Sequence, residues 1–352
     1  MRIFGKLLED NIPFAVYKKP DSQSLHFVIP DKLHFSGFPS FSGVKQKSGF
    51  VMAPFHPKTG KTKIFLPANR QVKFSLPSLW NEYTQRNEDV SYISDYQLNN
   101  KLSDEYVRQF TEYKNNFSPD FNKAILSKII TLRVDQLNIE EYFLRLARHY
   151  PGAFVYFVQL SKNVKWLGAT PETLIRLVNG EYEIMSLAGT SVTGEWTEKE
   201  KYEQQLVSDY IESLLRKFNI VNYRREGPGN FKAGKFYHLL TKYFIPVREL
   251  RDSLDGFINE LHPTPAVCGY PQRKALDLIL KTEKHNREYY AGYTGITGED
   301  NVLDLFVNIR CMKISGNDLF LYAGGGITPD SELEPEWLET ELKAGTLLNF
   351  LF

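Results

Sequence analysis

Cysteine and long apolar runs are both scarce in this chain of 352 residues. Its two cysteines, Cys268 and Cys311, lie in apolar stretches, and their spacing predicts neither a zinc site nor a disulfide framework. No stretch reaches the roughly 18 apolar residues that a membrane-spanning helix needs. The first residues carry charges at Lys6, Glu9 and Asp10, where a secretory signal peptide would have an apolar core. We therefore expect a soluble cytoplasmic protein with reduced thiols.

An excess of charge of one sign is absent as well, because 43 basic and 42 acidic residues leave a net charge of +1. A dedicated nucleic-acid-binding protein normally has a basic excess or a basic patch, so we expect no nucleic-acid partner. The sequence also lacks a P-loop, a dinucleotide-binding fingerprint, a nucleophile elbow and an H-E-x-x-H motif. The common templates for nucleotide binding, serine hydrolysis and zinc proteolysis are therefore missing.

No low-complexity segment or flexible linker divides the chain, and 42% of its residues are hydrophobic. A core large enough for one domain over residues 1–352 is expected from these numbers. Runs typical of strands outnumber those typical of helices and often follow one another directly, which predicts an α+β fold with large antiparallel sheets.

The expected elements are bounded by Pro, Gly and Asp residues and by helix-capping residues. Strands are predicted at 14–19, 25–30, 48–55, 62–68, 123–134, 153–160, 165–171, 173–180, 182–190, 289–297, 303–314 and 318–326. Helices are predicted at 103–118, 138–150, 197–218, 238–254 with an interruption at Pro246, 271–280, and from about Pro335 to the end. The polar segment 224–236 predicts a loop.

The C-terminal segment is the most informative part of the sequence. An apolar strand ends in the glycines 324–326, and the helix that follows carries Glu336 and Glu339, three residues apart, with Lys343 one turn later. Tight backbone beside two carboxylates and an ammonium group suits a small anionic ligand that is held through a divalent cation.

A second acidic pair, Glu200 and Glu203, has the same spacing on the helix predicted to be capped by Thr197. Two helices that each offer such a pair could face each other across a cleft and hold Mg²⁺, which prefers oxygen ligands. Paired glutamates are also common on solvated helix faces, so the spacing alone leaves both interpretations open.

Two single residues could carry acid–base chemistry. Glu172 follows a proline after a predicted strand, where a carboxyl group could serve as a general acid or could be an ordinary turn residue. Lys123 opens a predicted strand, where it could be solvated or could point into a substrate cleft and act as a base.

Further candidates are suited to binding a carboxylate. Arg310 lies in an apolar run predicted as a strand, where its guanidinium could bind a substrate carboxylate bidentately or pair with an acidic side chain. His262, in a proline-rich loop, could donate to a ligand oxygen or to the backbone. Gly189 and Thr190 could present N–H and hydroxyl donors or form a plain turn.

Taken together and in order, these motifs resemble the chorismate-utilising enzymes. The matching segments cover roughly residues 121–352 and read KAILSK, GATPETLI, SLAGT, KEKYEQQLV, LHPTPAVCGYP, REYYAGYTGI, LFVNIRCMKI and LYAGGGI followed by EPEWLETELKAGTLLN. Residues 1–100 carry no motif that can be placed, as is usual for the divergent part of this family. The segment after SLAGT departs from the family because it reads SVTGEW where arginines are usual.

The resemblance implies a fold and a set of roles. The fold would be a single domain with two mostly antiparallel β-sheets packed together and helices on the outside. Lys123 would be the general base that activates water, and Glu172 the general acid that protonates the departing 4-hydroxyl group. The implied Mg²⁺ ligands are Glu203 and Glu339, with Glu200 and Glu336 nearby. The implied substrate-binding residues are Gly189, Thr190, His262, Tyr290, Arg310, Gly324, Gly326 and Lys343.

Lys123 also selects a subclass within the family, since members that use ammonia generally lack this lysine. The resemblance therefore implies an isochorismate synthase, an isomerase feeding menaquinone or siderophore biosynthesis. It would act as a monomer without a glutamine amidotransferase subunit. A salicylate synthase, which goes on to eliminate pyruvate, would share every residue named. A non-catalytic anion-binding protein of the same fold is a further alternative, although it would need neither Lys123 nor Glu172.

Overall fold

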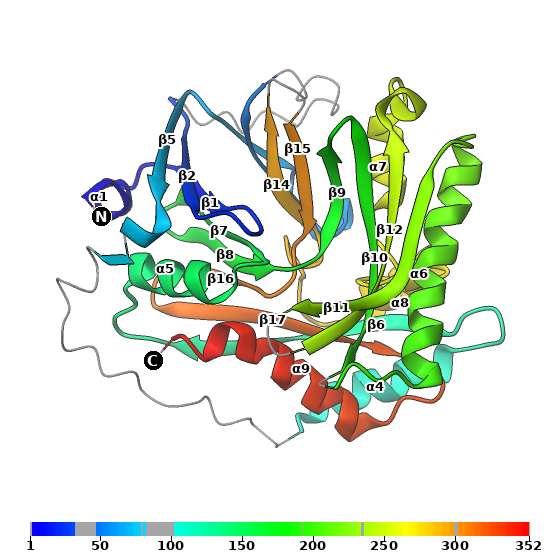
Figure 1. Ribbon diagram of the computed structural model, residues 1–352. Coiled ribbons are helices and arrows are strands. Elements are labelled where there is room, and N and C mark those ends of the chain that lie inside the picture. The colour runs from blue at the N-terminus through cyan, green and yellow to red at the C-terminus, as the bar shows by residue number, and fades with distance from the viewer. Residues whose placement is uncertain are drawn as a thin grey trace.

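Two antiparallel β-sheets form the body of the protein in the computed structural model. The structure describes residues 2–31, 47–78, 80–81, 102–191, 193–233, 236–298 and 302–351. Every strand pairing within these residues is antiparallel, and the helices lie around the outside of the sheets (Figure 1). None of the helices in the described ranges is long and apolar enough to cross a membrane.

The first sheet has the strand order β13-β6-β17-β16-β8-β7-β1-β2-β5. Its strands are β1 (Phe14–Lys18), β2 (Ser24–Ile29), β5 (Arg70–Ser75), β6 (Lys123–Arg133), β7 (Phe154–Ser161), β8 (Val164–Thr170), β13 (Gly269–Tyr270), β16 (Cys311–Ser315) and β17 (Asp318–Ile327). The second sheet has the order β11-β12-β10-β9-β15-β14-β3-β4. Its strands are β3 (Gly49–Ala53), β4 (Ile64–Pro67), β9 (Thr173–Val178), β10 (Glu181–Ser191), β11 (Arg224–Ala233), β12 (Phe236–Pro246), β14 (Tyr293–Gly298) and β15 (Val302–Val307).

The helices begin and end at residues that the sequence marks clearly. Ser103 caps α4 by accepting a hydrogen bond from the backbone of Tyr106, and Thr197 and Glu200 form the expected capping box of α6. The helices are α1 (Arg2–Glu9), α4 (Asp104–Asn116), α5 (Ile139–His149), α6 (Glu198–Lys217), α7 (Leu254–Leu261), α8 (Gln272–Thr282) and α9 (Leu333–Leu348), with short 3₁₀ turns η1 (Pro57–Thr59) and η2 (Val247–Leu250).

The side chains of β1 divide between two hydrophobic clusters because successive residues of a strand point to opposite faces. Ala15 and Tyr17 belong to the cluster between the sheets, whereas Phe14 and Val16 belong to the cluster beneath α1, α5 and α9. Where the sheets meet, the ring of Phe154 on the first sheet stacks on Phe306 of the second, with centroids 4.4 Å apart. The two sheets therefore pack face to face.

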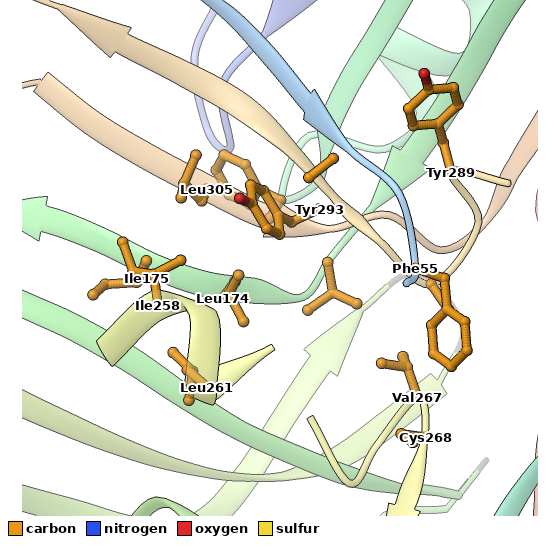
Figure 2. Packing of buried hydrophobic residues seen from close by; sticks show 14 of the residues in the cluster. Phe55, Leu174, Ile175, Ile258, Leu261, Val267, Cys268, Tyr289, Tyr293 and Leu305 are labelled. Atoms are coloured by element: carbon orange, nitrogen blue, oxygen red, sulfur yellow. The ribbon is translucent and has the colours of Figure 1, made fainter. Parts of the chain in front are cut away.

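Helix α7 packs against the second sheet. Figure 2 shows Ile258 and Leu261 of α7 beside Leu174 and Ile175 of β9. All four side chains are at most 1% exposed. A helix as short as α7 is marginal on its own, so this apolar packing stabilises it.

The predicted α+β class with two packed antiparallel sheets is confirmed, but three local predictions are wrong. Residues 238–254 do not form an interrupted helix, because 236–246 is strand β12 and the helix begins only at Leu254. The polar segment 224–236 is largely strand β11, which pairs with β12 at the sheet edge. The predicted strand 303–314 is two strands, β15 and β16, which belong to different sheets.

Candidate active site

A cavity lies between β6 and β17 of the first sheet and β10 and β12 of the second sheet. Helices α6 and α9 complete its lining. It collects residues that are up to 220 positions apart in the sequence, from Lys123 to Lys343. The predicted site residues that line it are Lys123, Glu172, Gly189, Glu200, Glu203, Tyr290, Arg310, Gly324, Gly326, Glu339 and Lys343.

Strand pairing explains how β6 and β17 form one wall. Ile125 lies opposite Gly326 in the antiparallel register, and Ser127 lies opposite Gly324. Because side chains alternate between the two faces, Lys123 and Ile125 point to the same side as the two glycines. The glycines carry no side chain there, so the lysine and the cavity occupy the space above the β17 backbone.

The wall leaves little space for a side chain at either glycine. A Cβ atom added at Gly326 would lie 3.2 Å from Cε of Lys123 and 3.5 Å from Oε2 of Glu203. A Cβ atom at Gly324 would lie 2.7 Å from the hydroxyl oxygen of Tyr290. Tyr290 is itself fixed by stacking on Tyr322, with ring centroids 5.3 Å apart.

The amine of Lys123 forms an ion pair with Glu203. Its Nζ atom donates to Oε2 at 3.2 Å, and the two side chains are 2% and 15% exposed. Lys123 comes from the start of β6 and Glu203 from the second turn of α6. The pair therefore joins the first sheet to the helix that carries both Glu200 and Glu203.

Glu172 lies in the short link between β8 and β9, where its backbone carbonyl accepts a hydrogen bond from Val307. Burial raises the pKa of its carboxyl group to about 7, although the nearby positive charges of Lys343, Lys123 and Arg310 act in the opposite direction. A carboxyl group with this pKa is substantially protonated near neutrality, so it can donate a proton into the cavity.

Arg310 lies in the link between β15 and β16 rather than inside a strand, with a left-handed φ of 49°. Its Nη1 atom donates to the carbonyl oxygen of Lys343 at 3.1 Å and to Oγ1 of Thr346 at 2.8 Å. Burial lowers the pKa of its guanidinium. These contacts attach the β15–β16 link to α9 and leave a half-buried positive charge at the cavity.

Lys343 and Glu339 form the part of α9 that faces the cavity. The Nζ atom of Lys343 lies 2.7 Å from Oε1 of Glu339 and donates to the carbonyl oxygen of Gly324 at 3.0 Å. The pair is one helical turn apart, and the lysine is 22% exposed. The helix thus presents a carboxylate and an ammonium group at the same cavity wall.

The glutamates of the cavity lining that could serve as ligands of a divalent cation are Glu200, Glu203 and Glu339. No compact group of three His, Cys, Asp or Glu residues is present within the described ranges. Glu203 and Glu339 each pair with a lysine, and Glu200 accepts from the backbone N–H of Thr197 at 2.9 Å. Carboxylate oxygens from two helices around a cavity nevertheless fit the oxygen-rich coordination that Mg²⁺ prefers, with space for water and a ligand.

Two predicted site residues do not line the cavity. His262 is half-buried outside the lining, where Nε2 lies 3.2 Å from the carbonyl oxygen of Phe55 and the ring packs edge-on against Tyr293. Burial lowers the pKa of His262 to about 4, so the imidazole is neutral. Glu336 lies on the opposite side of β17, where Oε1 accepts a hydrogen bond from Ser331. The side chain of Thr190 lies outside the described part of the chain.

The sequence did not reveal His238, which lines the cavity from β12. Its Nδ1 atom donates to the carbonyl oxygen of Gly189 at 2.7 Å, and burial lowers its pKa to about 4. The segment 238–254 was predicted to be a helix, and a helix would have given no reason to direct His238 towards Gly189. A strand prediction for 236–246 would have placed it opposite β10, next to SLAGT.

Comparisons with known proteins agree with this fold. A family model described as "Chorismate binding enzyme" matches residues 77–352. Isochorismate synthase EntC of Escherichia coli strain K12 is 29% identical over 246 residues, covering 66% of this chain and 63% of EntC. Anthranilate synthase component 1 of Aquifex aeolicus is 30% identical over 213 residues, which cover 56% of this chain and 43% of the relative.

The solved structure of DhbC from Bacillus anthracis has the same fold. It superposes with a TM-score of 0.77 at 21% sequence identity and covers 99% of both chains. The alignments with EntC and with the Aquifex relative span less than two thirds of each of those two proteins, whereas the fold is shared over almost the full length of DhbC.

Proposed function

This chain belongs to the chorismate-binding enzyme family, and we propose that it is an isochorismate synthase, an isomerase that converts chorismate to isochorismate in the presence of Mg²⁺. Isochorismate would then feed menaquinone or siderophore biosynthesis. In this proposal water is the nucleophile, so the enzyme needs no glutamine amidotransferase subunit and acts on a small-molecule substrate as a monomer.

One observation carries the proposal: Lys123 and Glu172 line the same cavity. The reaction replaces a hydroxyl group at C4 of the ring by one at C2, so it needs a base for the incoming water and an acid for the departing hydroxyl. The pKa of Glu172, raised to about 7, supports the role of acid. Lys123 is 1% exposed and lies within the same wall, which supports the role of base.

The proton balance of the proposed reaction closes between these two residues. Lys123, in its neutral form, accepts a proton from the water that attacks C2. Both ring double bonds shift, the bond from C4 to its oxygen breaks, and Glu172 donates the proton with which that oxygen leaves as water. Each turnover ends with an ammonium group and a carboxylate, which exchange protons with solvent or react in the reverse direction.

Glu203 and Glu339 are proposed to hold the divalent cation, with Glu200 beside them. The cation would supply positive charge for a substrate carboxylate and would compete with Lys123 for Glu203. That competition would release the amine of Lys123 from its ion pair with Glu203. Glu336 is not included, since its side chain faces away from the cavity.

Arg310 and Lys343 are proposed to bind the carboxylates of chorismate. Both are cationic and line the cavity near the bare backbone of Gly324 and Gly326. A planar guanidinium binds a carboxylate through two parallel hydrogen bonds, and the hydroxyl group of Tyr290 lies close to Gly324. These groups explain why a dianionic substrate would enter a cavity that also contains glutamates.

Product analysis tests the proposal against its alternatives. The purified protein is incubated with chorismate and Mg²⁺, with and without ammonium ions, and the products are separated by chromatography. Isochorismate without pyruvate supports the proposal. Salicylate with pyruvate would identify a salicylate synthase, anthranilate formed from ammonium would identify the activity that the Aquifex relative is named for, and binding without turnover would leave a non-catalytic protein.

A further inference from the structure

The polar segment 224–236 and the SVTGEW segment, which departs from the family pattern, contact each other through one side chain. Asn230 lies on the edge strand β11, in the polar segment 224–236, and it contacts the SVTGEW segment that follows β10. Its Oδ1 atom accepts a hydrogen bond from Nε1 of Trp196 at 2.6 Å, and its Nδ2 atom donates to the carbonyl oxygen of Gly194 at 3.0 Å. One amide group thus binds residues 193–197 at two points.

Trp196 connects this contact to the wall of the cavity. A Cβ atom added at Gly189 would lie 3.1 Å from Cζ3 of Trp196 and 3.0 Å from Cβ of Glu200. The indole ring and the base of Glu200 therefore both lie against the same backbone position of β10, which has a left-handed φ of 72°. A side chain at residue 189 would displace one of them.

The connection continues directly into α6. Trp196 is followed by Thr197, the capping residue, whose backbone N–H donates to Oε2 of Glu200 at 2.9 Å. Glu203 follows one turn later on the same helix. A displacement of residues 193–197 would therefore move the start of α6, and with it the carboxylates of Glu200 and Glu203.

Strand β11 reaches Gly189 by a second route. Phe231, the residue after Asn230, lies opposite His238 of β12, and His238 donates to the carbonyl oxygen of Gly189. Strand β11 therefore approaches Gly189 both through Trp196 and through His238. Asn230 itself is exposed and reaches the lining only through Trp196.

We propose that Asn230 is a positioning residue that, through Trp196, holds residues 193–197 against Gly189 and so orients Glu200 and Glu203 toward the divalent cation of the proposed function. Because Asn230 is exposed, its two hydrogen bonds contribute little to global stability. Their effect falls on the fraction of molecules in which both carboxylates are in place, and the apparent cation affinity scales with that fraction.

The test measures cation binding without turnover. Mn²⁺ serves as the probe because it takes the same oxygen ligands as Mg²⁺, and its electron paramagnetic resonance signal falls when it binds. Asn230→Ala removes both hydrogen bonds, and we expect it to bind Mn²⁺ about tenfold more weakly than the wild type. Trp196→Phe keeps a ring against Gly189 but loses the N–H donor, so its affinity should fall between the two.

Asn222→Ala is the matched control, since Asn222 is also exposed and its Nδ2 atom donates to Glu249, outside the cavity lining. Its Mn²⁺ affinity should equal that of the wild type. Should Asn230→Ala lower the unfolding temperature by more than a few degrees, Trp196→Phe carries the test in its place, because it removes the hydrogen bond to Asn230 and leaves Asn230 itself unchanged.

The outcomes separate this inference from the proposed function. Weaker Mn²⁺ binding by the Asn230 and Trp196 variants, with the Asn222 control unchanged, supports the positioning role. Wild-type affinity in Asn230→Ala, or in Trp196→Phe where that variant carries the test, overturns the positioning role and leaves the proposed function standing. Absence of Mn²⁺ binding by the wild-type protein overturns both the cation site and the positioning role, whatever the products of turnover.

Discussion

The amine of Lys123 lies 3.2 Å from the carboxylate of Glu203, and both side chains are largely buried. A base proposed for the reaction is therefore paired with a carboxylate proposed to hold the cation. Breaking a buried pair by removing one partner is costly unless the other finds a new one. A cation at Glu203 supplies that replacement, which couples cation binding to the release of the lysine amine.

Replacing Lys123 by alanine should abolish the addition of water. Loss of a general base costs about 10²–10⁴-fold in rate, whereas the carboxylate-binding groups Arg310 and Lys343 stay in place. We expect turnover of chorismate to fall by at least about 100-fold, while chorismate still binds in the presence of Mg²⁺. Stopped assays of product and calorimetric titration with chorismate measure the two effects separately.

Small amines provide the control for this variant. Ethylamine or propylamine can enter the space left by the lysine side chain, and their free-base form should restore part of the turnover in proportion to its concentration. Normal turnover by Lys123→Ala without any added amine would show that the lysine is not the base.

The pH dependence of turnover should reflect the carboxyl group of Glu172. Its pKa is raised to about 7, so the group is protonated below that pH and loses its proton above it. A reaction that needs the protonated acid should slow as the pH rises through about 7 in the free enzyme. The profile of kcat/KM measured from about pH 5 to pH 9 checks this. A profile that is flat between about pH 6 and pH 8 would argue against Glu172 as the acid.

The free energy of unfolding should also depend on pH through Glu172. The carboxyl pKa is raised from 4.5 to about 7 on folding, so between these values the folded protein binds more protons than the unfolded chain. Its stability therefore falls as the pH rises through this window. Relative to the wild type, Glu172→Gln should gain on the order of 3 kcal/mol between about pH 4.5 and pH 8, as measured by urea unfolding. A difference in stability that does not vary with pH would contradict the raised pKa.

Much of the fold was predictable because its signals are local. The alternating apolar runs on either side of SLAGT and AGGG, and the Thr197 and Glu200 capping box, each depend on neighbouring residues. Segment 236–246 was not predictable in this way. The apolar residues Leu239, Leu240, Tyr243 and Phe244 recur at a spacing that fits a helix. Only the pairing with β10 shows the alternate burial of Leu239, Tyr243 and Ile245 that is typical of a strand.

In the candidate site, too, local spacing predicted some residues correctly and could not place others. The i, i+3 spacing correctly brought Glu200 and Glu203 to one cavity but did not separate Glu336 from Glu339, because a helix that crosses a strand can place residues three apart on different sides of it. Glu336 is 1% exposed beneath Gly325, whereas Glu339 reaches the cavity. Which side a residue takes depends on the crossing of α9 over β17, and no local pattern in the sequence encodes that crossing.

Adding one methyl group at Gly326 should block the cavity while preserving the fold. The new Cβ atom would lie 3.2 Å from Cε of Lys123, and the backbone of Gly326 is not in the left-handed region. We expect Gly326→Ala to lower kcat/KM by at least about tenfold with little change in unfolding temperature. Gly152→Ala is the control, since the nearest atom to its added Cβ is 3.9 Å away in Asp21. Equal activity of the two variants would mean that the wall at Gly326 does not border the substrate.

Turnover in water enriched in ¹⁸O tests the central claim most directly. If Lys123 activates water for attack at C2 and Glu172 releases the C4 oxygen, isochorismate formed from unlabelled chorismate must carry ¹⁸O in its C2 hydroxyl group. Mass spectrometry of the product should then show a gain of two mass units, with the label located at C2 by fragmentation. Isochorismate without ¹⁸O at C2, or a product that carries nitrogen or has lost pyruvate, would contradict the account.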